Sequence, residues 1–140
     1  MAKAILGQID RTLGELQDCA SFSSTPAFRT LHKRLATGRE AMASAVEFML
    51  ANAKSDPNAV FAGGVPYLKL AGIVLVGWQF ARALLVAAEK HAEDKSFYDS
   101  KIATAQFFAD HVLPHAVALE ASIVSAKDNE GMLALSEDQF

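Results

Sequence analysis

The sequence contains one cysteine, Cys19, among its 140 residues. A single cysteine can form neither a disulfide within the chain nor a cluster of thiolate metal ligands. A protein that uses neither is typical of a reducing compartment, so we expect a cytoplasmic location. Residues 1–16 carry scattered charges and no uninterrupted apolar run, a pattern that does not predict a signal peptide.

Neither sign of charge is in clear excess. Thirteen Lys and Arg residues stand against sixteen Asp and Glu residues, which gives a formal net charge of −3 with neutral histidines. Such a balance produces no field that would gather nucleic acid or anionic lipid. We therefore expect no nucleic-acid partner.

Motifs for several common chemistries are missing as well. The eight glycines form no G-x-G-x-x-G pattern and no phosphate-binding loop. No serine or cysteine stands in a recognisable nucleophile motif. We predict no catalytic, cofactor-binding or metal-binding residue in this chain.

The most informative segment that is present is Pro66–Glu89, which is apolar almost all round a helix. A surface helix has one apolar stripe, whereas a helix that is apolar on every side lies inside a core or a membrane. Its length would allow a membrane span, since about 20 apolar residues cross a bilayer. Gln79 and Arg82 argue against a span, because an arginine near its middle costs about 2.5 kcal/mol or more. We expect this segment to be the deeply buried third helix of a soluble bundle, with no membrane span.

Apolar residues at steps of three and four predict an all-α fold, a four-helix up-and-down bundle in a single domain over residues 1–140. Pro26 is well placed as the first residue of the second helix, and Gly38 fills a gap in the apolar stripe of that helix. The segments between the second and third helices, 54–58 and 59–64, are expected to be turns and connectors. The expected helices cover about 2–20, 26–53, 66–91 and 96–125.

The fourth expected helix has the most regular apolar pattern. We expect Ser96 to cap it, with Asp99 three residues later as its partner. Pro114 should kink this helix without ending it, because proline removes one backbone donor and crowds the preceding turn. The apolar stripe alternates steps of four and three, which is typical of helices packed at a shallow angle; it comprises Tyr98, Ile102, Ala105, Ala109, Val112, Ala116, Leu119 and Ile123.

Trp78 lies midway along the third expected helix, and we expect it in the core with a partner for its indole N–H. Arg82 follows one turn later and could stack on the indole. Gly72, Gly77 and Ala81 favour close helix packing over a roomy cavity.

The histidines give no convincing metal site. His111 and His115 have the four-residue spacing that suits zinc, but no third ligand follows and Pro114 lies between them. We interpret them as solvated side chains that flank a kink. His32 and His91 stand alone and are expected at the surface or at helix ends. The chain also lacks the Glu-x-x-His spacing of di-iron bundles.

A small basic group on the second expected helix comprises Arg29, Lys33 and Arg34. Arg29 and Lys33 share one face and could hold a phosphate or a partner carboxylate. A solvated helix face is the simpler interpretation.

Three segments of the chain follow one another in a distinctive order: PYLKLAGIVLVGWQFARAL, FYDSKIATAQFFADHVLPHAVAL and LALSEDQF. In this order they resemble the C-terminal helical domain of one branch of the acyl-CoA dehydrogenases, which includes the 3-methylmercaptopropionyl-CoA dehydrogenase-like enzymes. The resemblance covers most of the chain and is strongest from Asp56 to Phe140. In that family a much larger core precedes this domain and carries the flavin site, the acyl-CoA cleft and the catalytic glutamate, and none of these core motifs occurs here.

The resemblance implies a non-catalytic C-terminal domain of an FAD-dependent oxidoreductase of fatty acid metabolism. Such a domain would pack on the flavoenzyme core or on a second subunit, as part of a homo-oligomer. FAD would belong to the larger enzyme, and no activity is expected from this chain alone. The alternative is an independent small protein that binds an apolar ligand between its helices.

The C-terminal tail forms a separate apolar group after a polar break. Its residues have no place in the stripe of the fourth helix, and exposed apolar clusters often mark contact surfaces. We expect self-association, or docking of the tail against a neighbouring chain, through Met132, Leu133, Leu135 and Phe140.

Overall fold

The computed structural model of the chain describes residues 1–125 and 135–139. Over these residues the elements are all helical, with no strand, which confirms the predicted all-α class. In chain order they are α1 Ala2–Asp18, α2 Ser21–Ser24, α3 Pro26–Asn52, α4 Pro57–Ala62, α5 Gly64–Lys90, α6 Lys95–His111, α7 His115–Val124 and the 3₁₀ turn η2 Glu137–Gln139.

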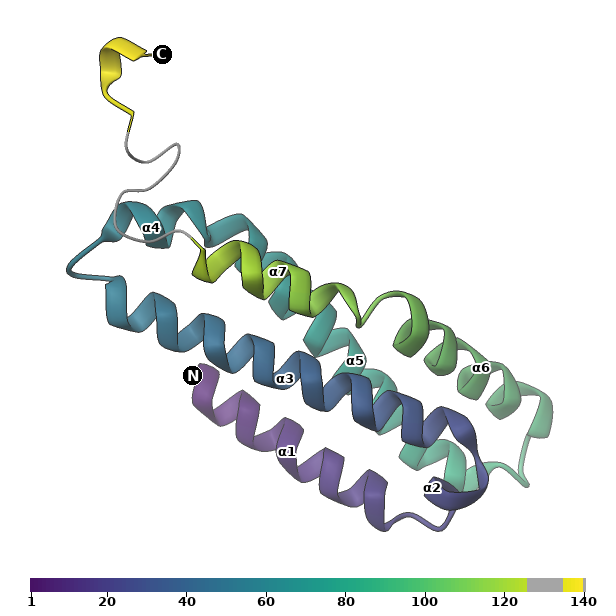
Figure 1. Ribbon diagram of the computed structural model, residues 1–140. Helices are drawn as coiled ribbons and strands as arrows, with labels where there is room; N and C mark the ends of the chain where they lie inside the picture. The colour runs from purple at the N-terminus through teal and green to yellow at the C-terminus, as the bar shows by residue number, and fades with distance from the viewer. Residues whose placement is uncertain (126–134, 140) are drawn as a thin grey trace.

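Four long segments lie side by side: α1, α3, α5 and the consecutive pair α6 and α7 (Figure 1). Each segment runs opposite to the one before it, and the short helices α2 and α4 lie at opposite ends of the molecule (Figure 1). The described residues therefore form more helices than the four that the periodicity predicts.

The helix at the centre of the packing is α3, and the expectation that the third long helix is the most deeply buried is wrong. Nine residues of α3 are buried against six of α5, and α3 packs against α1, α5, α6 and α7. One face of α5 lies in the core and the opposite face is exposed to solvent. Apolar residues all round a helix indicate that every side tends to be buried, but residues 1–125 and 135–139 supply partners for one side only.

The apolar residues at steps of three and four in the first two long helices predict one buried stripe on each, and most of these residues are buried, whereas Ile5 of α1 and Met49 of α3 are half-buried. A side chain at Gly38 would place its Cβ 3.3 Å from Val74 Cγ2, so this glycine allows α3 and α5 to approach closely. The buried stripe residues include Ile9, Leu13 and Leu16 of α1 and Phe28, Leu31, Leu35, Met42 and Ala45 of α3.

Pro114 divides the expected fourth helix into two. Helix α6 ends at His111, and the chain makes a turn over residues 112–114 before α7 begins at His115. Because Pro114 has no N–H, the i→i−4 ladder is interrupted, and the Leu113 amide donates instead to the carbonyl of Phe108, five residues earlier. The expectation of one kinked helix over 96–125 is therefore wrong.

The turn at Pro114 places Leu113 in the core, where it is almost fully buried. Leu113 lies outside the stripe predicted for a continuous helix. Of that stripe, Ala105, Ala109, Ala116 and Ile123 are buried as predicted.

Two helix starts differ from the predictions because aspartates act as caps. The Asp94 side chain accepts a hydrogen bond from the Phe97 amide (3.0 Å), so Asp94 caps α6 and the predicted cap at Ser96 is wrong. Asp56 accepts in the same way from the Ala59 amide (3.1 Å) and starts α4 within an expected connector.

The polar break after the first helix also contains a short helix, α2. The Arg29 guanidinium donates to the carbonyl oxygens of Phe22 (3.0 Å) and Ser23 (2.6 Å), which have no partner further along the helix. Arg29 thus links the turn between α1 and α3 through its Nη1 atom, and binding of a phosphate or carboxylate by Arg29 and Lys33 stays a prediction.

Candidate functional site

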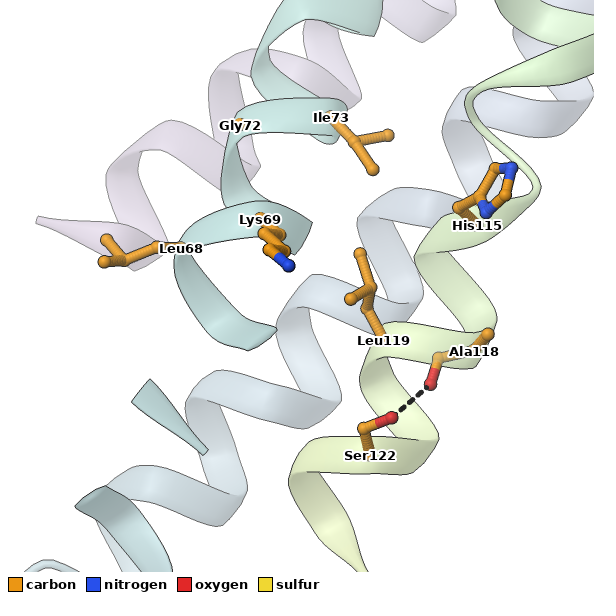
Figure 2. A pocket seen from close by; sticks show the side chains of 8 residues that line it. All are labelled: Leu68, Lys69, Gly72, Ile73, His115, Ala118, Leu119 and Ser122. Carbon is orange, nitrogen blue, oxygen red and sulfur yellow. Dashed lines mark hydrogen bonds between the residues drawn. The ribbon is translucent and has the colours of Figure 1, made fainter. Parts of the chain in front are cut away.

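An apolar groove of about 550 Å³ lies between the first half of α5 and α7 (Figure 2). Helices α5 and α7 pack against each other, and the groove lies beside this contact. Its lining comprises Leu68, Lys69, Gly72 and Ile73 of α5 and His115, Ala118, Leu119 and Ser122 of α7.

The floor and the rim of the groove differ in burial. Ile73 and Leu119 are half-buried and pack against the core cluster, and both point into the space between the two helices (Figure 2). Leu68 is 71% exposed and points away from α7 (Figure 2). A Cβ built on Gly72 would meet no atom within 4 Å, so the missing side chain leaves the groove open at its middle. The groove therefore continues onto the outer face of α5.

The groove is suited to an apolar surface or to an anion, because it has few polar groups and one of its side chains is positively charged. The Ser122 hydroxyl donates to the carbonyl of Ala118 within its own helix (3.0 Å) and is thereby satisfied. Within residues 1–125 and 135–139, neither Lys69 nor His115 forms an ion pair. Among the described residues that line the groove none is acidic, and the charged side chain among them is the positive Lys69.

A second, more polar groove of about 450 Å³ lies on the other side of α5, against α1. Together the two grooves border the outer face of α5 along most of its length. The second groove is lined by Thr12, Glu15, Gln79, Arg82, Ala83, Leu85 and Val86.

Trp78 lies between α1 and α5, next to this second groove. Its indole N–H donates to Thr12 Oγ1 (2.8 Å), and the Thr12 hydroxyl in turn donates to the carbonyl of Gln8 (3.2 Å). The Arg82 guanidinium lies 5.7 Å from the centre of the indole ring. The predicted hydrogen-bond partner and the predicted stacking are confirmed, but Trp78 is half-buried and not a full member of the core.

The structure does not bring His111 and His115 together into a metal site. His111 is exposed and packs on the ring of Phe107 at 4.7 Å between centroids, whereas His115 lines the groove. Over the residues that the structure describes, no three His, Cys, Asp or Glu side chains gather in a way that would hold a metal ion.

The two other histidines have local structural contacts. His32 is half-buried and meets the Phe22 ring edge-on at 5.4 Å, and its partial burial lowers the pKa of its imidazole. His91 follows the last residue of α5 and lies 2.7 Å from the Asp99 carboxylate, through Nε2 and Oδ1. Its position at a helix end is as predicted.

The apolar groups proposed for the tail lie mostly outside the described residues. These are Met132, Leu133 and Phe140. Leu135 is described and is exposed. The expected docking of the tail therefore stays a prediction.

Two segments are long and apolar enough to cross a membrane, judged by length and composition alone: Gly64–Lys90 and Lys95–Val124. Of the most apolar stretch of each, 33% and 22% is buried within the chain. A buried helix of a soluble protein passes the same test, so this observation is weak evidence for a span.

The sequence reasoning missed the groove between α5 and α7. It assigned Gly72 to close helix packing together with Gly77 and Ala81, and only the latter two are buried. The spacing along α5 does indicate that Gly72 faces outward. Leu70 and Val74 share one face of a helix with 3.6 residues per turn, and Gly72 falls on the opposite face.

Comparison with known proteins gives one family and two relatives. The profile of the family described as "Acetyl-CoA dehydrogenase C-terminal like" matches residues 5–133. The chain is 35% identical over 130 residues to 3-methylmercaptopropionyl-CoA dehydrogenase of Ruegeria pomeroyi, a match that covers 91% of this chain and 21% of that enzyme. It is 29% identical over 120 residues to the broad-specificity linear acyl-CoA dehydrogenase FadE5 of Mycobacterium tuberculosis, over 80% of this chain and 19% of that enzyme. The chain thus spans about a fifth of the length of the relatives that it matches.

Proposed function

We propose a function from one premise: the chain belongs to the family of acetyl-CoA dehydrogenase C-terminal-like domains, whose profile matches residues 5–133. On this premise it is the non-catalytic C-terminal helical domain of an FAD-dependent acyl-CoA dehydrogenase. It packs on the catalytic core of that enzyme or on a second subunit, and the parent enzyme is an oxidoreductase of fatty acid metabolism.

A single observation carries this proposal: the match to the Ruegeria enzyme takes in 91% of this chain but only 21% of that enzyme. We infer that the regions of the parent enzyme that correspond to the remaining four-fifths are the partner of this segment. In the proposal, the remainder supplies the flavin site and the acyl-CoA cleft, and this chain supplies a helical surface.

The same proposal includes a bundle that works as one unit in water. We infer that α1, α3, α5 and the pair α6 and α7 act as a four-helix up-and-down bundle, because residues from all of them share one core cluster. We propose no membrane span, since both candidate spans contribute to this core and α5 carries Arg82. No nucleic-acid partner is proposed, in view of the charge balance. A cytoplasmic location and a homo-oligomeric parent are part of the proposal.

The experiment that tests the proposal is to extend the reading frame upstream of Met1 and to produce the longer protein beside the 140-residue chain. The longer protein should be yellow, with a stoichiometric flavin spectrum, and its flavin should be bleached by an acyl-CoA. The 140-residue chain alone should be colourless and should not reduce an electron acceptor when an acyl-CoA is added. A stoichiometric flavin on the short chain, or a longer protein without flavin, would contradict the proposal.

The groove between α5 and α7 supports a second candidate function, binding of an apolar ligand between helices. Its volume of about 550 Å³ lies within the range of about 300–1,000 Å³ that is usual for ligand pockets. The fluorescent fatty acid cis-parinaric acid is a suitable probe for the 140-residue chain. Saturable binding that Gly72→Leu abolishes would favour this candidate, because the leucine would occupy the open middle of the groove.

A further inference from the structure

The outer face of α5 carries a second regular apolar stripe. Its positions are spaced three or four residues apart and are all exposed or half-buried. One of them, Gln79, is polar and accepts a hydrogen bond from the Arg82 guanidinium (3.2 Å); the others are Val65, Leu68, Gly72, Val76, Ala83 and Val86. The exposed fractions of Val65, Leu68 and Val76 are 64%, 71% and 45%. A soluble helix normally presents polar residues on this side.

The spacing of the stripe indicates what kind of surface covers it. Steps of three and four are the pattern with which one helix packs along another at a shallow angle. Gly72, at a position where a side chain would meet no atom within 4 Å, lets the backbone of a partner helix come close.

The charges beside the stripe indicate the chemistry of the partner. Lys69 lies on the α7 side of the stripe and Arg82 on the α1 side, because each lines the groove on that side. On the α1 side Glu15 lines the groove together with Arg82, so among the described lining residues the charge without a nearby opposite charge is Lys69 on the α7 side. A helix with an apolar stripe and a carboxylate on the side that faces Lys69 would be complementary to this arrangement. A second copy of the chain fits less well, since a symmetric contact across Gly72 would bring the Lys69 side chains of both copies near the same axis.

The position of the N-terminus is consistent with a partner that precedes the chain. Residue 1 lies at the same end of the molecule as the start of α5 and the end of α7 (Figure 1). The family is described as C-terminal, and the relatives are about five times longer than the matched segment. A core that precedes residue 1 therefore reaches the domain at the end where the stripe begins.

From these observations we infer that the outer face of α5, from Val65 to Val86, is the surface that docks on the catalytic core of the parent acyl-CoA dehydrogenase. The inference rests on the proposed function and adds the surface and the chemistry of its partner. The contact on the core is an amphipathic helix with an apolar stripe and an acidic residue on the side that faces Lys69.

The test compares the reactivity of introduced thiols in the parent flavoprotein and in the 140-residue chain. Val76→Cys, in the middle of the stripe, is the probe, and Leu68→Cys is a second probe if the first variant does not fold. Glu40→Cys is the matched control, because Glu40 is also exposed on a long helix but lies on α3. Cys19→Ser removes the native thiol from all variants. The labelling reagent is N-ethylmaleimide, with mass spectrometry as the readout.

We expect Val76→Cys to react more slowly in the parent than in the isolated chain, by a factor of about ten or more, because a docked surface reacts only when it opens. The Glu40→Cys control should react at the same rate in both. Equal rates for Val76→Cys in a yellow parent protein would overturn the docking surface and leave the proposed function intact. A parent without flavin would instead overturn the proposed function.

Two further results would assign the stripe to another occupant and so overturn the inference. The first is protection of Val76→Cys in the isolated chain that increases with protein concentration, which would indicate a second copy. The second is protection of the isolated chain by phosphatidylglycerol vesicles with full reactivity in the parent, which would indicate a membrane surface.

Discussion

The two faces of α5 have similar compositions and different surroundings. The inward face carries Leu70, Val74, Gly77, Ala81 and Leu84, all buried. The outward face repeats the same spacing with Val65, Leu68, Gly72 and Val76, and these are exposed or bordered by open grooves. An apolar helix face therefore indicates a surface that is suited to burial, while its actual burial depends on what the rest of the protein provides.

The glycines of α5 show the same contrast on a smaller scale. A Cβ on Gly77 would lie 2.9 Å from Leu113 Cδ2, so the absent side chain leaves room for a core leucine of another segment. A Cβ on Gly72 would meet nothing within 4 Å. Leu113 already occupies the space beside Gly77, whereas the space beside Gly72 is open to a partner.

The largest expected effect compares two leucines that are two residues apart. Leu70→Ala should lower the free energy of unfolding of the 140-residue chain by about 2–5 kcal/mol, because a fully buried leucine loses its contacts and leaves a cavity. Leu68→Ala should change it by less than about 0.5 kcal/mol, the usual range for exposed positions. Urea denaturation followed by circular dichroism measures both. Similar losses for the two variants would show that the outward face is covered within this chain.

Smaller changes in the free energy of unfolding, of opposite sign, are expected for alanine substitutions at Gly77 and Gly72. Gly77→Ala should destabilise the chain by about 1 kcal/mol, since overpacking against Leu113 typically costs 1–3 kcal/mol and outweighs the better helix propensity of alanine. Gly72→Ala should stabilise the isolated chain by about 0.5–1 kcal/mol, because only the propensity changes. Denaturation midpoints that move in the same direction would contradict the contrast between the two faces.

A third comparison concerns the polar contact at the border between the faces. Trp78→Phe should cost about 1 kcal/mol, because it removes the hydrogen bond to Thr12 but keeps most of the ring contacts. Combining it with Thr12→Val in a double-mutant cycle isolates the interaction, and the coupling energy should also be about 1 kcal/mol. A coupling energy near zero would mean that the bond does not stabilise the chain in solution.

Much of the fold could be predicted because local patterns and packing agree. The stripe of α3 from Phe28 to Ala45 and the gap at Gly38 appear in the structure as expected. The start of α4 was also present in the sequence, as the Asp56–Pro57 pair that commonly caps and begins a helix. The start of α6 at Asp94 followed the same capping chemistry, one residue before the helix, whereas Ser96 lies within it.

Other features depend on tertiary contacts that a periodic pattern does not contain. The burial of Leu113 follows from the turn that Pro114 enforces, which changes the phase of the helix on either side. The groove requires that α7 lie beside the exposed half of α5, and its open middle requires that Gly72 face outward. Periodicity identified α5 as apolar on every side, and the prediction of deep burial was wrong because the described residues pack against one side of this helix only.

The central claim is that the outward face of α5 is covered by the catalytic core of the parent enzyme. Its most direct test is a specific protease site introduced just before residue 1 of the parent protein, followed by cleavage and size-exclusion chromatography. We predict that the cleaved domain co-elutes with the yellow core, and that Val76→Asp in the same protein releases it, because an uncompensated charge would be buried at the contact. Release of the unsubstituted domain, or retention of the Val76→Asp domain with the core, would contradict the account.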